Sequence, residues 1–165
     1  LVPLRIFDGE QAELVLTRRS ENLGSHAGQV AFPGGKVDPG DRTIEEAALR
    51  EAHEELGIAP ERVELVGHLD HAPSITGFHV TPVVGVVAPE VSFVPNPGEV
   101  ARVFSVPLAR LLELDRWERR AHPYRGGSVK IWHFPWDGED IWGMTGHMIR
   151  GFVEMLDRFS RSAGA

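Results

Sequence analysis

Residues 33–58, PGGKVDPGDRTIEEAALREAHEELGI, constrain this chain more than any other stretch, because they join a glycine-rich loop to a short helix with an acidic side. Thr43 followed three residues later by Glu46 forms a capping box, which is typical of a helix start. Gly57 is a common stop signal. The sequence therefore predicts a helix over residues 44–56.

Three glutamates share one side of the predicted helix. At about 100° per residue, Glu51, Glu54 and Glu55 fall within an arc of roughly 100°, whereas Ala52 and Leu56 lie on a separate packing face. Like charges at this spacing cost a helix roughly 0.2–0.5 kcal/mol per pair. A hard divalent cation such as Mg²⁺ or Mn²⁺ would reverse that sign, because it prefers carboxylate oxygens. We predict a metal site here, although a run of glutamates on a helix is ordinarily a solvated face.

The loop before the helix favours the metal interpretation. Gly34 and Gly35 allow tight turns and a close approach of the backbone to whatever the carboxylates hold. Loop and helix together resemble the signature of the Nudix hydrolases, which cleave a nucleoside diphosphate linked to another group. The residues that fit this signature are Gly35, Arg50, Glu51, Ala52, Glu54, Glu55, Gly57 and Ile58.

The chain departs from the signature in the loop. Asp41 stands where the family has glutamate, and eight residues rather than seven separate it from Arg50. The additional residue lies where the loop meets the helix, so it affects the geometry of the loop more than the acidic face. The resemblance implies metal binding by Glu51, Glu54 and Glu55.

A second resemblance lies immediately upstream. Residues 16–20, LTRRS, and 25–35, SHAGQVAFPGG, are similar to the additional motif of the coenzyme A pyrophosphatase branch, although Gly24 replaces a basic residue. This resemblance implies hydrolysis of the diphosphate bond of coenzyme A or a derivative to 3′,5′-ADP and 4′-phosphopantetheine or its acyl form. ADP-ribose, dinucleotides and nucleoside triphosphates stay open as substrates. A non-catalytic module that senses a nucleotide is the further alternative.

The resemblance also indicates candidate roles around the acidic side. Glu99, in a Pro/Gly loop, is the candidate for a carboxylate outside the helix that completes the metal site or acts as the base, and Glu54 is the alternative base. We interpret Arg50 as the residue that orients Glu54, four positions away, rather than as a substrate contact. One of the two arginines that close the second strand is expected to bind a phosphate through paired hydrogen bonds, with plain solvation of both as the alternative. The expected substrate-binding residues are Arg18, Arg19, Gln29, Gly34, Gly35 and Lys36.

Composition narrows the class of protein. The 165 residues suit one domain, 1–165, with a substantial core, and the absence of cysteine fits a cytoplasmic protein without disulfides. A net charge of −7 argues against a general nucleic-acid binder. Residues 71–89 contain no charged side chain, but their prolines and glycines exclude a membrane helix. We expect a cytoplasmic monomer or homodimer that acts on a small molecule, with no nucleic-acid or membrane partner.

Hydrophobic patterning supplies the remaining elements. A short helix should begin at Pro107 and end near Leu114. The resulting order of strands and helices implies an α/β (α+β) protein with a mixed sheet covered on both faces, which the family resemblance identifies as a Nudix-like α/β/α sandwich. The first two predicted strands, 1–7 and 13–17, flank an Asp8-Gly9 turn in a hairpin-like arrangement. The other predicted strands are 29–32, 63–69 and 78–87, a strand after the 95–99 loop that ends at 106, and a hairpin of 117–124 and 128–136.

The C-terminal part is expected to contribute mainly to packing. Thr145 is a suitable N-cap for a helix whose apolar residues follow helical spacing. We interpret three tryptophans as core residues, with stacking on an adenine as the alternative, and three histidines as structural rather than metal-binding. These residues are Met148, Ile149, Phe152, Leu156 and Phe159 on the helix, Trp132, Trp136 and Trp142, and His68, His71 and His79.

Overall fold

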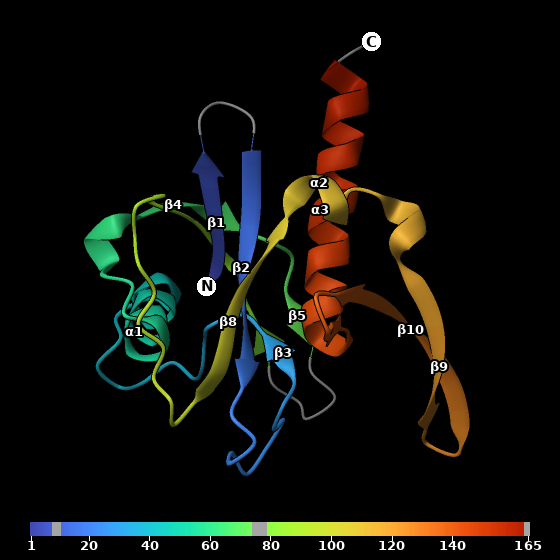
Figure 1. The fold of residues 1–165 in the computed structure, drawn as a ribbon, viewed down its shortest axis with the longest axis horizontal. Helices are drawn as coiled ribbons and strands as arrows, with labels where there is room; N and C mark the ends of the chain where they lie inside the picture. The colour runs from blue at the N-terminus through green and yellow to red at the C-terminus, as the bar shows by residue number, and fades with distance from the viewer. Residues whose placement is uncertain (8–10, 74–78, 164–165) are drawn as a thin grey trace.

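A mixed sheet lies between two helices in the computed structural model, which describes residues 1–7, 11–73 and 79–163 (Figure 1). The strand order is β3-β2-β1-β7-β4. Strands β1 and β3 pair with one edge of β2, and β8 pairs with its opposite edge. Only β1 and β7 run parallel; the remaining pairs in this sheet are antiparallel. The strands are β1 (Val2–Phe7), β2 (Gln11–Arg19), β3 (Val30–Ala31), β4 (Val63–His68), β7 (Val83–Val87) and β8 (Val100–Pro107).

The first two strands form the predicted antiparallel pair, with Leu4 opposite Leu14. The Asp8-Gly9 turn that was expected to join them lies outside the described residues. Alternation along β2 then divides the core. Leu14 and Leu16 point toward α3 (Gly143–Ala163), whereas Val15 points toward α1 (Ile44–Leu56). The predicted sandwich, with helices on both faces of a mixed sheet, is confirmed.

Helix α3 differs from its prediction at both ends. It begins at Gly143 rather than after Thr145. The Thr145 hydroxyl does not cap the helix; it donates a 3.0 Å hydrogen bond to the Val30 carbonyl of β3. Ile149 and Phe152 are buried as expected, but Phe159 is 73% exposed because the helix extends beyond the sheet there.

The C-terminal hairpin forms as predicted from β9 (Glu118–Tyr124) and β10 (Gly127–Trp136), to which β11 (Glu139–Ile141) adds a third strand. Its two-residue turn is Arg125-Gly126, with φ of 47° and 78°, a conformation that suits the twist of a hairpin. Figure 1 shows β9 and β10 extending away from the sandwich, on the far side of α3 from α1.

Proline interrupts the strand predicted over residues 78–87. The described part consists of β6 (His79–Val80) and β7, separated by Thr81-Pro82, because proline lacks the N–H that a central strand requires. A two-residue strand, β5 (Ala72–Pro73), pairs with β6. The helix expected from Pro107 to Leu114 is shorter, and two 3₁₀ turns complete the chain: α2 is Leu108–Leu111, η1 is Pro60–Arg62 and η2 is Leu114–Arg116.

Within the described ranges, no helix has both the length and the apolar character needed to cross a bilayer.

Candidate active site

The acidic helix has the predicted limits. The Thr43 hydroxyl accepts a 3.1 Å hydrogen bond from the Glu46 amide, and Gly57 ends the helix in a left-handed conformation with φ of 68°. Ala52 and Leu56 are completely buried against the sheet. The capping box is incomplete in one respect, because the Glu46 carboxylate accepts from the Arg42 amide instead of reaching the Thr43 amide. Helix α1 therefore fixes its acidic side through local capping and an apolar contact with the sheet.

Glu55 is the most buried carboxylate of the acidic side, with an exposed fraction of 3%. Its Oε1 accepts a hydrogen bond of 3.4 Å from the Gly34 amide, so the glycine loop lies directly against it. Burial raises the pKa of Glu55 to about 7, and the negative charges of Glu51 and Glu99 add to this shift. Arg19 opposes it. A carboxylate in this environment would gain from a nearby cation.

Glu51 lies against the neighbouring glycine. A Cβ added to Gly35 would overlap the Glu51 carboxylate, so any larger residue at this position would displace that side chain. Burial raises the pKa of Glu51, the hydrogen bond from Arg50 lowers it, and the charges of Glu54 and Glu99 raise it further. Gly34 and Gly35 thus each place main chain beside one carboxylate of α1.

Glu99 reaches the same region from outside the helix. It ends the loop before β8, where the Asn96 side-chain amide donates a 3.1 Å hydrogen bond to its Oε1. Its carbonyl accepts from the Ser20 amide at 2.8 Å, which ties the loop to the end of β2. Because the charge of Glu99 acts on both Glu51 and Glu55, three carboxylates from two separate elements share one negatively charged region.

Arg50 connects the loop to the acidic side. Its Nη1 donates to Glu51 and to Glu54, each at 3.1 Å, so the predicted proximity of Arg50 and Glu54 is confirmed. Its Nε and Nη2 donate to the Asp41 carboxylate at 3.0 Å, and Nη2 also donates to the Lys36 carbonyl at 3.0 Å. These hydrogen bonds lower the pKa of Asp41. Sequence reasoning missed this pair, although Asp41 occupies the acidic position of the signature.

The candidate substrate residues lie on different sides of the sheet. Arg19 is near enough to Glu55 to influence its pKa. Alternation along β2 places Arg18 on the opposite face, paired in register with Arg102. In both arginines the Nε atom is buried and has no hydrogen-bond partner among the described residues. The Gln29 carbonyl accepts from the Arg19 amide at 2.9 Å, while its side chain meets His26. Lys36 is exposed in the glycine loop.

The carboxylates fit a divalent cation in their chemistry. Glu51, Glu55 and Glu99 offer hard oxygen donors in a partly buried region, where burial first, and then the charges of neighbouring carboxylates, raise the pKa of Glu51 and Glu55. Across the described residues, no three acidic or histidine side chains are already spaced to hold an ion. Arg50 accounts for part of this, because its guanidinium bridges Glu51 and Glu54, and the Glu54 side chain is 51% exposed.

The tryptophans and the described histidines lie elsewhere. The guanidinium groups of Arg119 and Arg150 both contact the Trp132 ring, at 5.1 and 4.4 Å from its centre. Trp136 donates to the Ser105 carbonyl, and Trp142 lies beside His122 and His133. His68 pairs with Glu45 at 2.8 Å, and His71 contacts Thr81. Stacking of a tryptophan on adenine stays a prediction.

Comparison with known proteins identifies what this arrangement is similar to. The family model described as the NUDIX domain matches residues 2–126. The protein named "Uncharacterized Nudix hydrolase NudL" from Enterobacter sp. (strain 638) is 45% identical over 150 residues, which cover 91% of this chain and 77% of that protein. The protein of the same name from Klebsiella pneumoniae subsp. pneumoniae is 47% identical over the same shares of the two chains.

Solved structures agree on the fold. The MutT protein from Methanosarcina mazei Go1 superimposes with a TM-score of 0.58 over 96% of this chain and 91% of its own, at 22% identity. The Nudix hydrolase RenU from M. smegmatis gives a TM-score of 0.55 over 66% of this chain and 68% of its own, at 26% identity. The first comparison includes the C-terminal helix region, so the likeness extends beyond the residues that the family model matches.

Proposed function

Because this chain belongs to the Nudix hydrolase family, whose members act on pyrophosphate bonds, we propose that it hydrolyses the diphosphate of coenzyme A or one of its derivatives. Water adds to one phosphorus, the bridging P–O bond breaks, and the products are 3′,5′-ADP and 4′-phosphopantetheine or its acyl form. The observation that carries the catalytic part is the convergence of Glu51, Glu55 and Glu99 beside the glycine loop. The motifs at residues 16–20 and 25–35 support coenzyme A as the substrate.

The chemistry requires neutralisation of a strongly anionic substrate and activation of water. Mg²⁺ or Mn²⁺, held by Glu51 and Glu55 together with Glu54 or Glu99, would supply positive charge to the diphosphate and lower the pKa of a bound water. The main chain of Gly34 and Gly35 allows substrate to approach these carboxylates closely. Proton removal from water falls to Glu54 or Glu99, whichever reaches it in the complex.

Two basic residues suit the substrate phosphates in this proposal. Arg19 brings positive charge to Glu55 and has a buried Nε without a partner among the described residues. Lys36 is exposed in the loop that borders the carboxylates. Arg18 would act from the other face of β2, so it is better suited to a distal phosphate than to the diphosphate that is cleaved.

We also propose that residues 1–165 act as one cytoplasmic domain. One apolar cluster unites Val2 of β1, Leu14 of β2, Phe134 of β10 and Ile149 of α3, so the C-terminal part shares a core with the part that the family model matches. The lack of cysteine supports a reducing compartment.

The test is a product assay with coenzyme A, ADP-ribose and ATP in parallel, each with Mg²⁺ or Mn²⁺ and with EDTA. We expect 3′,5′-ADP from coenzyme A, released in the presence of metal and not in EDTA. Faster cleavage of ADP-ribose or ATP would overturn the substrate assignment and retain the pyrophosphatase. Binding of nucleotides without cleavage of any of them would establish a non-catalytic module instead.

A further inference from the structure

The β9–β10 ribbon, residues 117–136, presents an exposed surface that has no cover among the described residues. Between residues 118 and 130, every residue except His122 is exposed. A two-stranded ribbon alone is marginally stable in water, so one that extends from a domain benefits from a partner. Tyr124 and Val129, near the turn, each expose 41% of their surface. The tip therefore offers apolar contact area as well as charge.

The base of the ribbon is held firmly, so the tip is presented in a defined direction. The Trp117 and Phe134 rings lie 5.0 Å apart, and Phe134 is 1% exposed. Above them, Arg120 of β9 forms a 2.9 Å ion pair with Asp140 of β11. His133 contacts the same carboxylate at 2.9 Å. These contacts join the base to the rest of the molecule and leave the turn end free.

The ribbon is basic in an acidic protein. It contains four cationic side chains and one acidic one, a net charge of +3 in a chain of −7. Two of the four lie toward the tip: Arg125, in the turn, and Lys130, on β10. Neither forms an ion pair with a described residue, whereas Arg120 is paired with Glu118 and Asp140. Arg119, nearer the base, likewise forms no ion pair with a described residue, so two of the three unpaired cations of the ribbon lie toward the tip.

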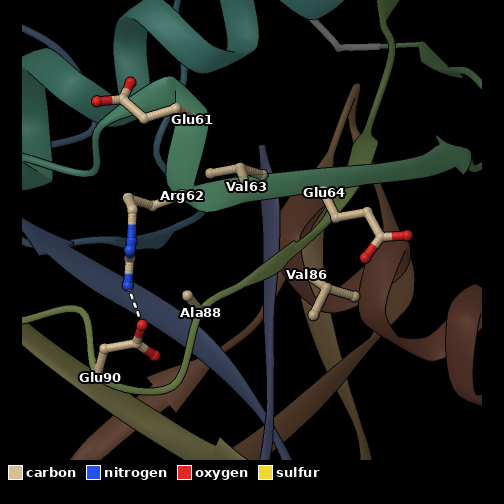
Figure 2. Close-up of a pocket in the computed structure, with 7 residues that line it drawn as sticks. All are labelled: Glu61, Arg62, Val63, Glu64, Val86, Ala88 and Glu90. Carbon is tan, nitrogen blue, oxygen red and sulfur yellow. Dashed lines mark hydrogen bonds and ion pairs between the residues drawn. The ribbon is translucent and has the colours of Figure 1, made fainter.

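An acidic hollow lies at the free edge of β4 (Figure 2). Figure 1 shows β4 on the opposite side of the molecule from β9 and β10. It is lined by Glu61, Val63, Glu64 and Val86 and by the Arg62–Glu90 ion pair. Glu64 and Val86 lie opposite each other in register on one face of the sheet, whereas Val63 packs on the other face, toward α1. Figure 2 shows Glu61 and Glu64 directed away from that pair. Neither glutamate has an ion-pair partner among the described residues. The hollow thus combines unpaired negative charge with the apolar side chain of Val86 at a strand edge that has no neighbour in the described sheet.

We propose that the ribbon tip of one copy docks at the β4 edge of a second copy of this chain. Arg125 and Lys130 are complementary in charge to Glu61 and Glu64, and Tyr124 and Val129, which lie on one face of the ribbon, match the apolar side chain of Val86. The two surfaces lie at opposite sides of one molecule, so a single chain does not bring them together. Two copies related by a two-fold axis would form the contact twice.

The test exchanges charges between the two surfaces and measures mass by sedimentation velocity. Arg125→Glu with Lys130→Glu reverses the tip, and Glu61→Lys with Glu64→Lys reverses the edge. We expect the wild-type protein to dimerise at about 50 mM NaCl and to weaken at about 500 mM NaCl, because exposed charges are screened. Each double variant alone should dimerise roughly a hundredfold more weakly, because like charges then face each other. An equimolar mixture of the two should recover the dimer.

A matched control reverses two charges elsewhere. Arg158→Glu with Arg161→Glu changes the same total charge on the exposed end of α3 and should leave the dimer unchanged. Circular dichroism verifies that all variants are folded. A wild-type protein that is monomeric at low salt, or a mixture that stays monomeric, would overturn the proposal. So would a monomer whose ribbon binds poly(A) RNA in a manner that the tip reversal abolishes.

Discussion

The acidic side of α1 and the C-terminal ribbon differ in how their residues are held. In and around α1, decisive contacts join residues close in sequence: Thr43 with Glu46, and Arg50 with Glu54. At the base of the ribbon, Phe134 is buried by residues distant in the chain, among them Leu14 and Ile149. The first region concentrates like charge and gains little stability from it, whereas the second buries apolar surface. The comparison indicates that the proposed catalytic site and the main apolar core of the ribbon base are located in different parts of this molecule.

The largest expected effect tests the stability half of this comparison. Phe134→Ala should lower the free energy of unfolding by about 3–5 kcal/mol, because it removes a large side chain from a close-packed core. The specific activity of the molecules that stay folded should not change. Urea denaturation gives the first quantity, and an assay at low temperature gives the second. The matched control is Phe159→Ala, which alters an exposed phenylalanine of α3 and should change stability by no more than about 0.5 kcal/mol.

The next effect tests the activity half. Glu55→Gln should lower kcat/KM roughly 10²- to 10³-fold while leaving the fold intact, because it removes a charge from the proposed metal site. Release of the nucleotide product measures the rate. Glu45→Gln is the control, since Glu45 lies on the same helix but pairs with His68. Wild-type turnover in Glu55→Gln, or an equal loss in Glu45→Gln, would contradict the assignment of Glu55.

The smallest expected effect is a change in the stability of the protein with pH, which arises at the acidic side of α1. Burial first, and then the charges of Glu51 and Glu99, raise the pKa of Glu55 from 4.5 to about 7. At Glu55 the folded protein therefore binds more protons than the unfolded chain within this window, so the contribution of this group to stability is fully present below pH 4.5 and is lost as pH rises through 7. In EDTA we expect a loss of roughly 2–3 kcal/mol from this group. Thermal unfolding at a series of pH values measures it.

Two comparisons test the origin of that loss. The Glu55→Gln variant cannot ionise at this position and should lack this part of the pH dependence. Saturating Mg²⁺ should restore stability to the wild type at neutral pH, because an ion that binds only the folded state stabilises it. If wild type and variant show the same pH dependence in EDTA, or if Mg²⁺ has no effect on the wild type, carboxylate repulsion is not the cause.

Local signals explain which parts of the fold could be predicted. Both ends of α1 match because Thr43 and Gly57 mark them within the sequence itself. The start of α3 was predicted wrongly because the Thr145 hydroxyl bonds to Val30, 115 residues away, and not to its own helix. The strand over 78–87 was drawn through Pro82, whose missing N–H interrupts it. Errors occurred where tertiary contacts or a single backbone group outweighed the hydrophobic pattern.

The residues of the candidate site likewise divide into those that local sequence signals predict and those whose positions depend on tertiary contacts. The glutamates of α1 and their proximity to Arg50 could be predicted from helical spacing. The pairing of Asp41 with Arg50 could not, because it depends on the path of an irregular loop. Likewise, the proximity of Glu99 to Glu51 and Glu55 depends on a loop that is tied to β2 across the sheet. Which of these carboxylates binds metal and which acts as base stays a prediction.

The hydrogen bonds of Arg50 have a consequence for the substrate. A guanidinium has five N–H groups, and Asp41, Glu51, Glu54 and the Lys36 carbonyl together engage Nε, Nη1 and Nη2. All five N–H donors of Arg50 are therefore occupied, so none of them is available to a substrate phosphate. Other cationic side chains must then bind the substrate phosphates. Replacing Arg50 with lysine would break several of the hydrogen bonds that hold the loop against the helix, because an ammonium group has only three donors.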